Sequence, residues 1–153
     1  MNKEKYFTQV QQEICSLLEK NLCVNDARKR ICEILRKIPG YDWVGFYIAD
    51  NEKQILILDQ FVGEQTEHVK IPFGKGICGQ SAISSKSLVV KDVSKEDNYI
   101  ACSYDVKSEI VIPIFKDGVF VAQLDIDSHN SGNFDNVDKE YLEKICDKIS
   151  CLF

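Results

Sequence analysis

Residues 109–128 have the sequence EIVIPIFKDGVFVAQLDIDS, in which two runs of β-branched and aromatic residues flank a Lys-Asp-Gly segment. This pattern predicts a β-hairpin with strands over residues 109–115 and 120–128. Successive side chains of a strand point to opposite faces of the sheet, so the second strand has one acidic and one apolar face. The acidic face is expected to carry Val121, Gln123, Asp125 and Asp127, and the core face Phe120, Ala122, Leu124 and Ile126.

The connection between these strands determines whether a third acid, Glu109, joins the acidic face. A three-residue loop over 116–118, with Gly118 in the left-handed conformation, places Glu109 opposite Asp125. A two-residue turn shifts the register by one and moves Glu109 to the other face. Glycine at the third loop position favours the first register. We therefore expect Glu109, Asp125 and Asp127 to line one pocket.

Three neighbouring carboxylates repel one another when all are ionised. At least one of them is therefore expected to have a raised pKa and to hold a proton near neutral pH. Such a group could protonate an oxygen atom while its ionised neighbours bind an ammonium group. The alternative is that Asp125 and Asp127 line the solvated face of an edge strand, and the pattern alone favours neither.

The remainder of the chain predicts an α+β fold. Helices are expected over residues 4–21 and 26–38, from about Ile77, and after an N-cap at Asp135, with further strands over 41–50, 54–62 and 87–90. Hairpin connections between most of the strands favour a largely antiparallel sheet of about six strands with helices packed on it.

Composition narrows the classes of function. The 153 residues are 44% hydrophobic, which suits a single domain with one core. The net charge of −5 argues against binding to nucleic acid or to an anionic membrane. The first twenty residues have charges scattered through an amphipathic pattern, which fits neither a signal peptide nor a spanning helix. We therefore expect a cytoplasmic protein that handles a small molecule.

The cysteines indicate reactive thiols more than a structural framework. Their number is odd, at seven, and no two have Cys-x-x-Cys spacing, which argues against a disulfide scaffold or a zinc ribbon. Cys102 lies in the polar, turn-prone segment NYIACSYDVK, 98–107, where a buried structural cysteine is not expected. His68 and His129 have no closely spaced partners, so we predict no metal site and no cofactor.

Four motifs together resemble one known family. WVGFY (43–47), IPFGKGICG (71–79), IACSYDVKSEIVIPIFKDG (100–118) and LDIDS (124–128) are similar to the motifs of the free methionine-(R)-sulfoxide reductases, which have a GAF domain. The resemblance is collinear over about residues 40–145, and the combination is far more specific than any one motif. It implies a single GAF domain spanning residues 1–153 that reduces free L-methionine (R)-sulfoxide, with thioredoxin as the source of electrons.

The resemblance also implies a role for each matching residue. The nucleophile is Cys102, the second cysteine is Cys78, the substrate-binding acids are Glu109, Asp125 and Asp127, and the aromatic residues around the substrate are Trp43 and Tyr47. A thiolate would attack the sulfoxide sulfur while a protonated carboxyl group stabilises the departing oxygen, which leaves methionine and a sulfenic acid. A second thiol would then form a disulfide that thioredoxin opens.

One position departs from the family pattern. Fully equipped members carry a resolving cysteine where this chain has His68. Cys78 is the candidate substitute if it can come within disulfide reach of Cys102. Two other interpretations stay open: a GAF module that only binds a ligand, and a thiol sensor with a regulatory Cys78–Cys102 disulfide. The amphipathic first helix is also a candidate surface for a homodimer.

Overall fold

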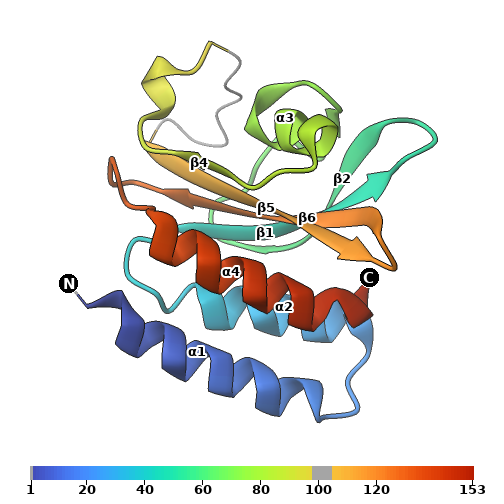
Figure 1. Ribbon diagram of the computed structural model, residues 1–153, viewed down its shortest axis with the longest axis vertical. Coiled ribbons are helices and arrows are strands. Elements are labelled where there is room, and N and C mark those ends of the chain that lie inside the picture. The colour runs from blue at the N-terminus through green and yellow to red at the C-terminus, as the bar shows by residue number, and fades with distance from the viewer. Residues whose placement is uncertain (1, 98–104) are drawn as a thin grey trace.

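A computed structural model describes residues 2–97 and 105–153, and over these residues the chain forms a six-stranded antiparallel sheet with helices on both faces (Figure 1). The helices are α1 (Lys3–Leu18), α2 (Val24–Leu35), α3 (Gly76–Ser84) and α4 (Asn136–Ile149), with short 3-10 helices at Val93–Lys95 and Ser150–Leu152. The strands are β1 (Trp43–Asp50), β2 (Ile55–Val62), β3 (Lys70–Pro72), β4 (Leu88–Val90), β5 (Ser108–Lys116) and β6 (Val119–Ser128).

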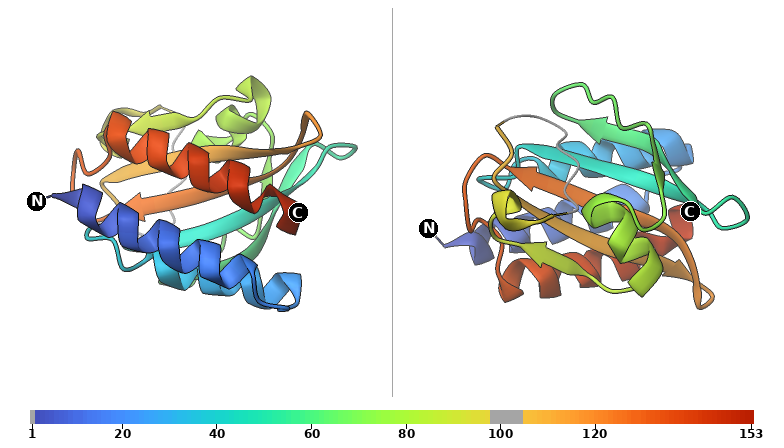
Figure 2. Two further views of the ribbon diagram at one scale, coloured as in Figure 1. Left: turned by 60° about the horizontal axis from the view of Figure 1, so that its bottom comes forward. Right: turned by 90° about the horizontal axis from the view of Figure 1, so that it is seen from above.

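The strands lie in the order β3-β2-β1-β6-β5-β4, so β1, β6 and β5 are interior strands of the described sheet. Helices α2 and α4 pack on one face, and α1 packs against those two helices, whereas α3 lies across the opposite face (Figure 2). The α+β prediction is confirmed. The three-residue strand β3 had no sequence signal, because it is too short to show an alternating pattern.

The sheet separates two apolar clusters. The larger lies between the sheet and helices α1, α2 and α4, and it includes Phe7, Ile31 and Leu124. The smaller lies between the sheet and α3, and it includes Tyr47, Ile77 and Val111. Both faces of β5 and β6 are therefore buried, which explains why the first of these strands is an almost continuous apolar run.

The turn between β5 and β6 differs from the predicted three-residue loop. It has two central residues, Asp117 and Gly118, which both have positive φ angles, 52° and 76°, as in a type I′ turn, and Lys116 pairs with Val119. A register shift follows at once, because Phe115 pairs with Phe120 but the preceding residue of β5 pairs with Ala122. Val121 is the extra residue of this bulge.

The two-residue turn alone would place Glu109 on the opposite face of the sheet, and the bulge shifts the register by one more residue and so restores the predicted face. Glu109 pairs with Asp127, and Val111 pairs with Asp125, so the predicted Glu109–Asp125 pair is wrong by two residues. The prediction that Glu109 shares a face with the two aspartates is nevertheless right. The assignments of Phe120 and Val121 are exchanged: Phe120 packs in the cluster under α3, and Val121 packs against the opposite cluster.

A buried polar contact fixes α4 against the rest of the fold. Asp135 caps α4 as predicted, and Asp138 completes a capping box with it. The Asp138 carboxylate also accepts a hydrogen bond of 2.7 Å from the Tyr41 hydroxyl and contacts Lys3 Nζ of α1 at 3.1 Å. Among the described residues, the helices are too short or too polar to cross a membrane.

Candidate functional site

Strands β1, β6 and β5 present one row of polar and aromatic side chains to α3. On β1 this row contains Trp43, Gly45 and Tyr47, and the strand pairs place Asp127, Asp125 and Gln123 beside them on β6. Glu109 and Val111 continue the row on β5. Side chains as far apart in the sequence as Trp43 and Asp127 thus become neighbours at the centre of the sheet. The site is built on rigid strands, which hold its groups in a fixed arrangement.

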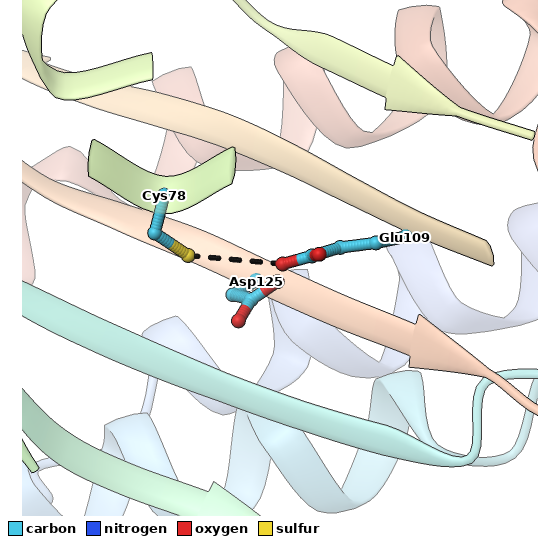
Figure 3. A group of neighbouring side chains, drawn as sticks. All are labelled: Cys78, Glu109 and Asp125. Carbon is cyan, nitrogen blue, oxygen red and sulfur yellow. Dashed lines mark hydrogen bonds between the residues drawn. The ribbon is translucent and has the colours of Figure 1, made fainter. Parts of the chain in front are cut away.

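The acids of this row are buried. Glu109 is 4% exposed, and Asp125 and Asp127 are each 1% exposed. The alternative of a solvated edge strand is therefore wrong for both aspartates. Cys78 on α3 points toward Glu109 and Asp125, and its Sγ donates to Glu109 Oε1 over 3.8 Å (Figure 3). The Cys78 Sγ, one carboxylate oxygen of Glu109 and one of Asp125, each an atom that could bind a metal ion, all lie within 4.8 Å of one another.

Burial and mutual repulsion perturb the acids as predicted. Removal from water raises the pKa of Glu109 well above its ordinary value, and the negative charges of Asp125 and Asp127 raise it further. Burial also raises the pKa of Asp125, but the hydrogen bonds it accepts from Glu109 and Cys78 oppose that shift. Of the two acids, Glu109 therefore has the stronger tendency to hold a proton, and Asp125 accepts the hydrogen bond from it.

The glycine-rich segment before α3 positions Cys78. Gly76 begins the helix with a φ of 65°, which an L side chain rarely adopts. A Cβ on Gly79 would lie 2.8 Å from the Pro72 carbonyl oxygen, so only glycine lets α3 approach β3 this closely. Gln123 donates from Nε2 to the Cys78 carbonyl oxygen over 3.2 Å, which ties α3 to β6.

Two aromatic side chains form one side of the site. The Trp43 indole stacks on Phe61 with centroids 5.5 Å apart and donates from Nε1 to the Glu64 carbonyl oxygen over 3.0 Å. The Tyr47 hydroxyl donates to the His68 carbonyl oxygen over 2.9 Å. The indole also covers Gly45, where an added Cβ would lie 2.4 Å from it. Both rings therefore have fixed positions.

A small pocket opens beside the acids. Its lining residues are His68, Ile71, Lys75, Gly76, Ile77, Cys78, Glu109 and Asp125. Of the residues predicted from the sequence, Cys78, Glu109 and Asp125 line it, while Trp43, Tyr47 and Asp127 lie in the adjoining row but not in the pocket lining. The predicted nucleophile Cys102 lies outside the described residues.

Sequence reasoning missed two groups that support the site. Gln123 was placed on the acidic face but given no role, and the strand alternation was the signal that could have assigned it one. Phe61 comes from β2, and only the pairing of Gly45 with Phe61 brings it under Trp43. That contact depends on a register the sequence does not specify.

Comparisons with known proteins agree on one family. The GAF domain family matches residues 25–151. The structure of fRMsr of Staphylococcus aureus in its reduced form is 36% identical, covers 95% of this chain and 94% of its own, and has a TM-score of 0.87. The free methionine-R-sulfoxide reductase from Neisseria meningitidis in complex with its substrate is 33% identical, with 94% and 85% coverage and a TM-score of 0.87. The free methionine-R-sulfoxide reductase of Saccharomyces cerevisiae is 43% identical over 73% of this chain and 64% of its own length.

Proposed function

The chain belongs to the GAF-domain family and, within it, to the free methionine-R-sulfoxide reductases, and from this premise we propose that it reduces free L-methionine (R)-sulfoxide to methionine. One observation of the molecule itself carries the proposal. Glu109 is a buried carboxyl group with a raised pKa, beside Asp125 and within hydrogen-bonding distance of a thiol. Reduction of a sulfoxide needs a proton donor next to a sulfur nucleophile, and this pocket supplies the donor.

In the proposed reaction, the thiolate of Cys102 attacks the sulfoxide sulfur, which forms a transient sulfur–sulfur bond, and the proton of Glu109 passes to the sulfoxide oxygen. The hydroxyl group then moves to the Cys102 sulfur as the sulfur–oxygen bond and the transient sulfur–sulfur bond both break. Methionine is released with the electron pair on its sulfur and a sulfenic acid is left on Cys102, so the substrate sulfur is reduced and the cysteine is oxidised. The ionised aspartates, Asp125 and Asp127, bind the substrate ammonium group. Trp43 and Tyr47 enclose the apolar end of the substrate and exclude water.

Recycling of the enzyme is assigned to Cys78. Its thiol attacks the sulfenic acid of Cys102, water leaves, and a disulfide forms that the dithiol of thioredoxin reduces. The burial of Cys78 beside the acids, at 4% exposure, supports this choice because any second thiol must reach the reacting centre. A thiol reductant is maintained in a reducing compartment, so we assign the reaction to the cytoplasm.

A homodimer stays a prediction, but its surface must differ from the one first considered. The apolar face of α1, with Phe7, Val10, Ile14 and Leu17, is buried within the chain. Light scattering of the purified protein measures the oligomeric state directly.

The test is formation of methionine from free L-methionine (R)-sulfoxide, supplied with thioredoxin or with dithiothreitol. Wild type and Cys23→Ser, whose thiol is exposed at the start of α2 on the other face of the sheet, should be active with both reductants. Cys102→Ser should be inactive with both. Cys78→Ser should lose turnover with thioredoxin and keep part of it with dithiothreitol. The (S)-sulfoxide serves as the substrate control.

The pattern of failure separates the proposals. Turnover in Cys102→Ser would show that Cys102 is not the nucleophile. Full thioredoxin-dependent turnover in Cys78→Ser would show that Cys78 is not the resolving thiol. If wild type binds the sulfoxide but no reductant supports turnover, the chain is a ligand-binding GAF module. The histidine at position 68, where family members carry a thiol, is the observation that favours this second function.

A further inference from the structure

Three side chains of different elements bring potential metal-ligating atoms close together. Cys78 comes from α3, Glu109 from β5 and Asp125 from β6, and their ligand atoms lie within 4.8 Å of one another (Figure 3). All three residues are buried, at 4%, 4% and 1% exposure. The sequence placed Glu109 and Asp125 in one pocket but did not predict a metal site, because the contact with Cys78 depends on the packing of α3 and the group contains no histidine.

A second observation points to a cation at the same place. Asp125 Oδ1 is buried and has no hydrogen-bond partner among the described residues, and neither has Gln123 Oε1 on the same face of β6. Buried carboxylate oxygens are normally satisfied by donors or by metal ions. Asp125 is one of the residues that line the pocket beside Cys78 and Glu109.

We propose that Cys78, Glu109 and Asp125 form a binding site for a zinc ion, with water in the fourth position. One thiolate with two carboxylates is a donor set that suits borderline Zn²⁺, whereas Mg²⁺ and Ca²⁺ select oxygen donors alone. In a tetrahedral site, typical Zn–S and Zn–O lengths place sulfur and oxygen about 3.6 Å apart. The observed Cys78 Sγ–Glu109 Oε1 distance of 3.8 Å is close to that value.

Binding exchanges protons for the metal. The Cys78 thiol and the Glu109 carboxyl group each lose a proton, and Zn²⁺ takes their place without any change of oxidation state. The ion also removes the repulsion among the acids that otherwise keeps Glu109 protonated. Zinc affinity should therefore rise with pH.

Zinc binding would oppose the proposed reductase activity. Zinc would occupy the proton donor and the resolving thiol of the proposed reductase, so a bound ion would block turnover and act as a reversible inhibitor. That consequence rests on the proposed function, but the binding itself does not.

The experiment measures binding directly on the reduced, full-length protein. Co²⁺ is titrated as a spectroscopic probe, followed by competition between Zn²⁺ and a chromophoric chelator. Wild type should bind one equivalent and give the intense near-ultraviolet absorption of a cobalt–thiolate bond. Cys78→Ser should lose that absorption. Glu109→Gln and Asp125→Asn should weaken zinc binding by more than about tenfold, in line with the sensitivity of metal sites to their ligands.

Control variants guard against binding at other thiols. Cys23→Ser and Cys151→Ser remove exposed thiols and should leave the equivalent of bound metal unchanged. Far-ultraviolet circular dichroism establishes that each variant is folded, and Asp125→Asn keeps the proposal testable if Cys78→Ser does not fold. Unchanged zinc affinity in both acid variants, or an unchanged cobalt–thiolate band in Cys78→Ser, would overturn the site.

Activity then separates this proposal from the reductase proposal. Zinc binding with no reductase activity in the metal-free protein would leave the metal site standing and remove the proposed function. Reductase activity with no zinc binding would do the reverse.

Discussion

The Glu109→Gln substitution keeps the shape of a buried side chain and removes its ability to ionise. In the folded protein, burial and the nearby Asp125 and Asp127 raise the pKa of Glu109 well above its ordinary value of 4.5. The unfolded chain has no such environment, so between the two pKa values the folded state binds more protons. The stability that Glu109 contributes is therefore complete below about pH 4.5 and is lost as pH rises toward the folded pKa.

The magnitude follows from proton linkage. One proton of difference between the folded and unfolded states changes the free energy of unfolding by about 1.4 kcal/mol for each pH unit. Wild type should lose up to that amount per unit above pH 4.5 through this group, until the folded pKa is reached. Glu109→Gln has no such slope. The variant should thus gain stability relative to wild type as pH rises from 5 to 8.

Guanidinium unfolding at several pH values between 5 and 8 measures this difference. The single tryptophan, Trp43, is buried beside the acids and reports unfolding by its fluorescence. Glu52→Gln, on an exposed turn, is the matched control and should follow the wild-type pH profile. The same Glu109→Gln protein should lose about 10²–10⁴ in turnover because it lacks the proton donor. Parallel stability profiles for wild type and Glu109→Gln would refute the electrostatic reasoning.

Two further substitutions probe how the fold holds the site. Tyr41→Phe removes the 2.7 Å hydrogen bond to the buried Asp138 carboxylate, so thermal unfolding should show a loss of about 1.5–3 kcal/mol, whereas Tyr6→Phe at the surface should change little. Gly79→Ala places a Cβ 2.8 Å from the Pro72 carbonyl oxygen, and the displacement of α3 should lower stability by about 1–3 kcal/mol and reduce thioredoxin-dependent turnover. An unshifted melting temperature in either variant would contradict the corresponding contact.

Local patterns predicted most of the elements, because apolar periodicity and capping are encoded within a few residues. Asp135 at the start of α4 is an example, since its side chain needs only the next turn to act as an N-cap. The register of β5 and β6 was only partly encoded in such patterns. The Asp117-Gly118 pair is typical of a type I′ turn and could have predicted the two-residue turn, but the bulge at Val121 lies in an apolar run without a glycine or proline to mark it. The shorter turn and the bulge each shift the predicted register by one residue in the same direction. Because side chains alternate between faces, a total shift of two leaves Glu109 on the predicted face.

The motifs identified the acids as a group. The raised pKa values of Glu109 and Asp125, however, result from burial, which a local motif does not specify. The strand alternation predicted a shared face for Asp125 and Asp127, and the placement of β5 and β6 inside the sheet, with α3 above them, removed that face from water. The proximity of Cys78 to Glu109 arose from the packing of α3, which depends on Gly79 and on the hydrogen bond from Gln123. Long-range packing of this kind leaves no local signal.

Function and stability are opposed at this centre. Burying Glu109, Asp125 and Asp127 together destabilises the folded state, since each desolvated carboxylate raises the free energy of its neighbours' ionised forms. A sequence selected for stability alone would place apolar residues on this face, as it does on the opposite face of β6 with Ala122, Leu124 and Ile126. The same repulsion raises the pKa of Glu109, and it is the repulsion that the proposed zinc ion would relieve. A substitution that relieves the repulsion should therefore stabilise the protein, and for the same physical reason it should abolish the chemistry.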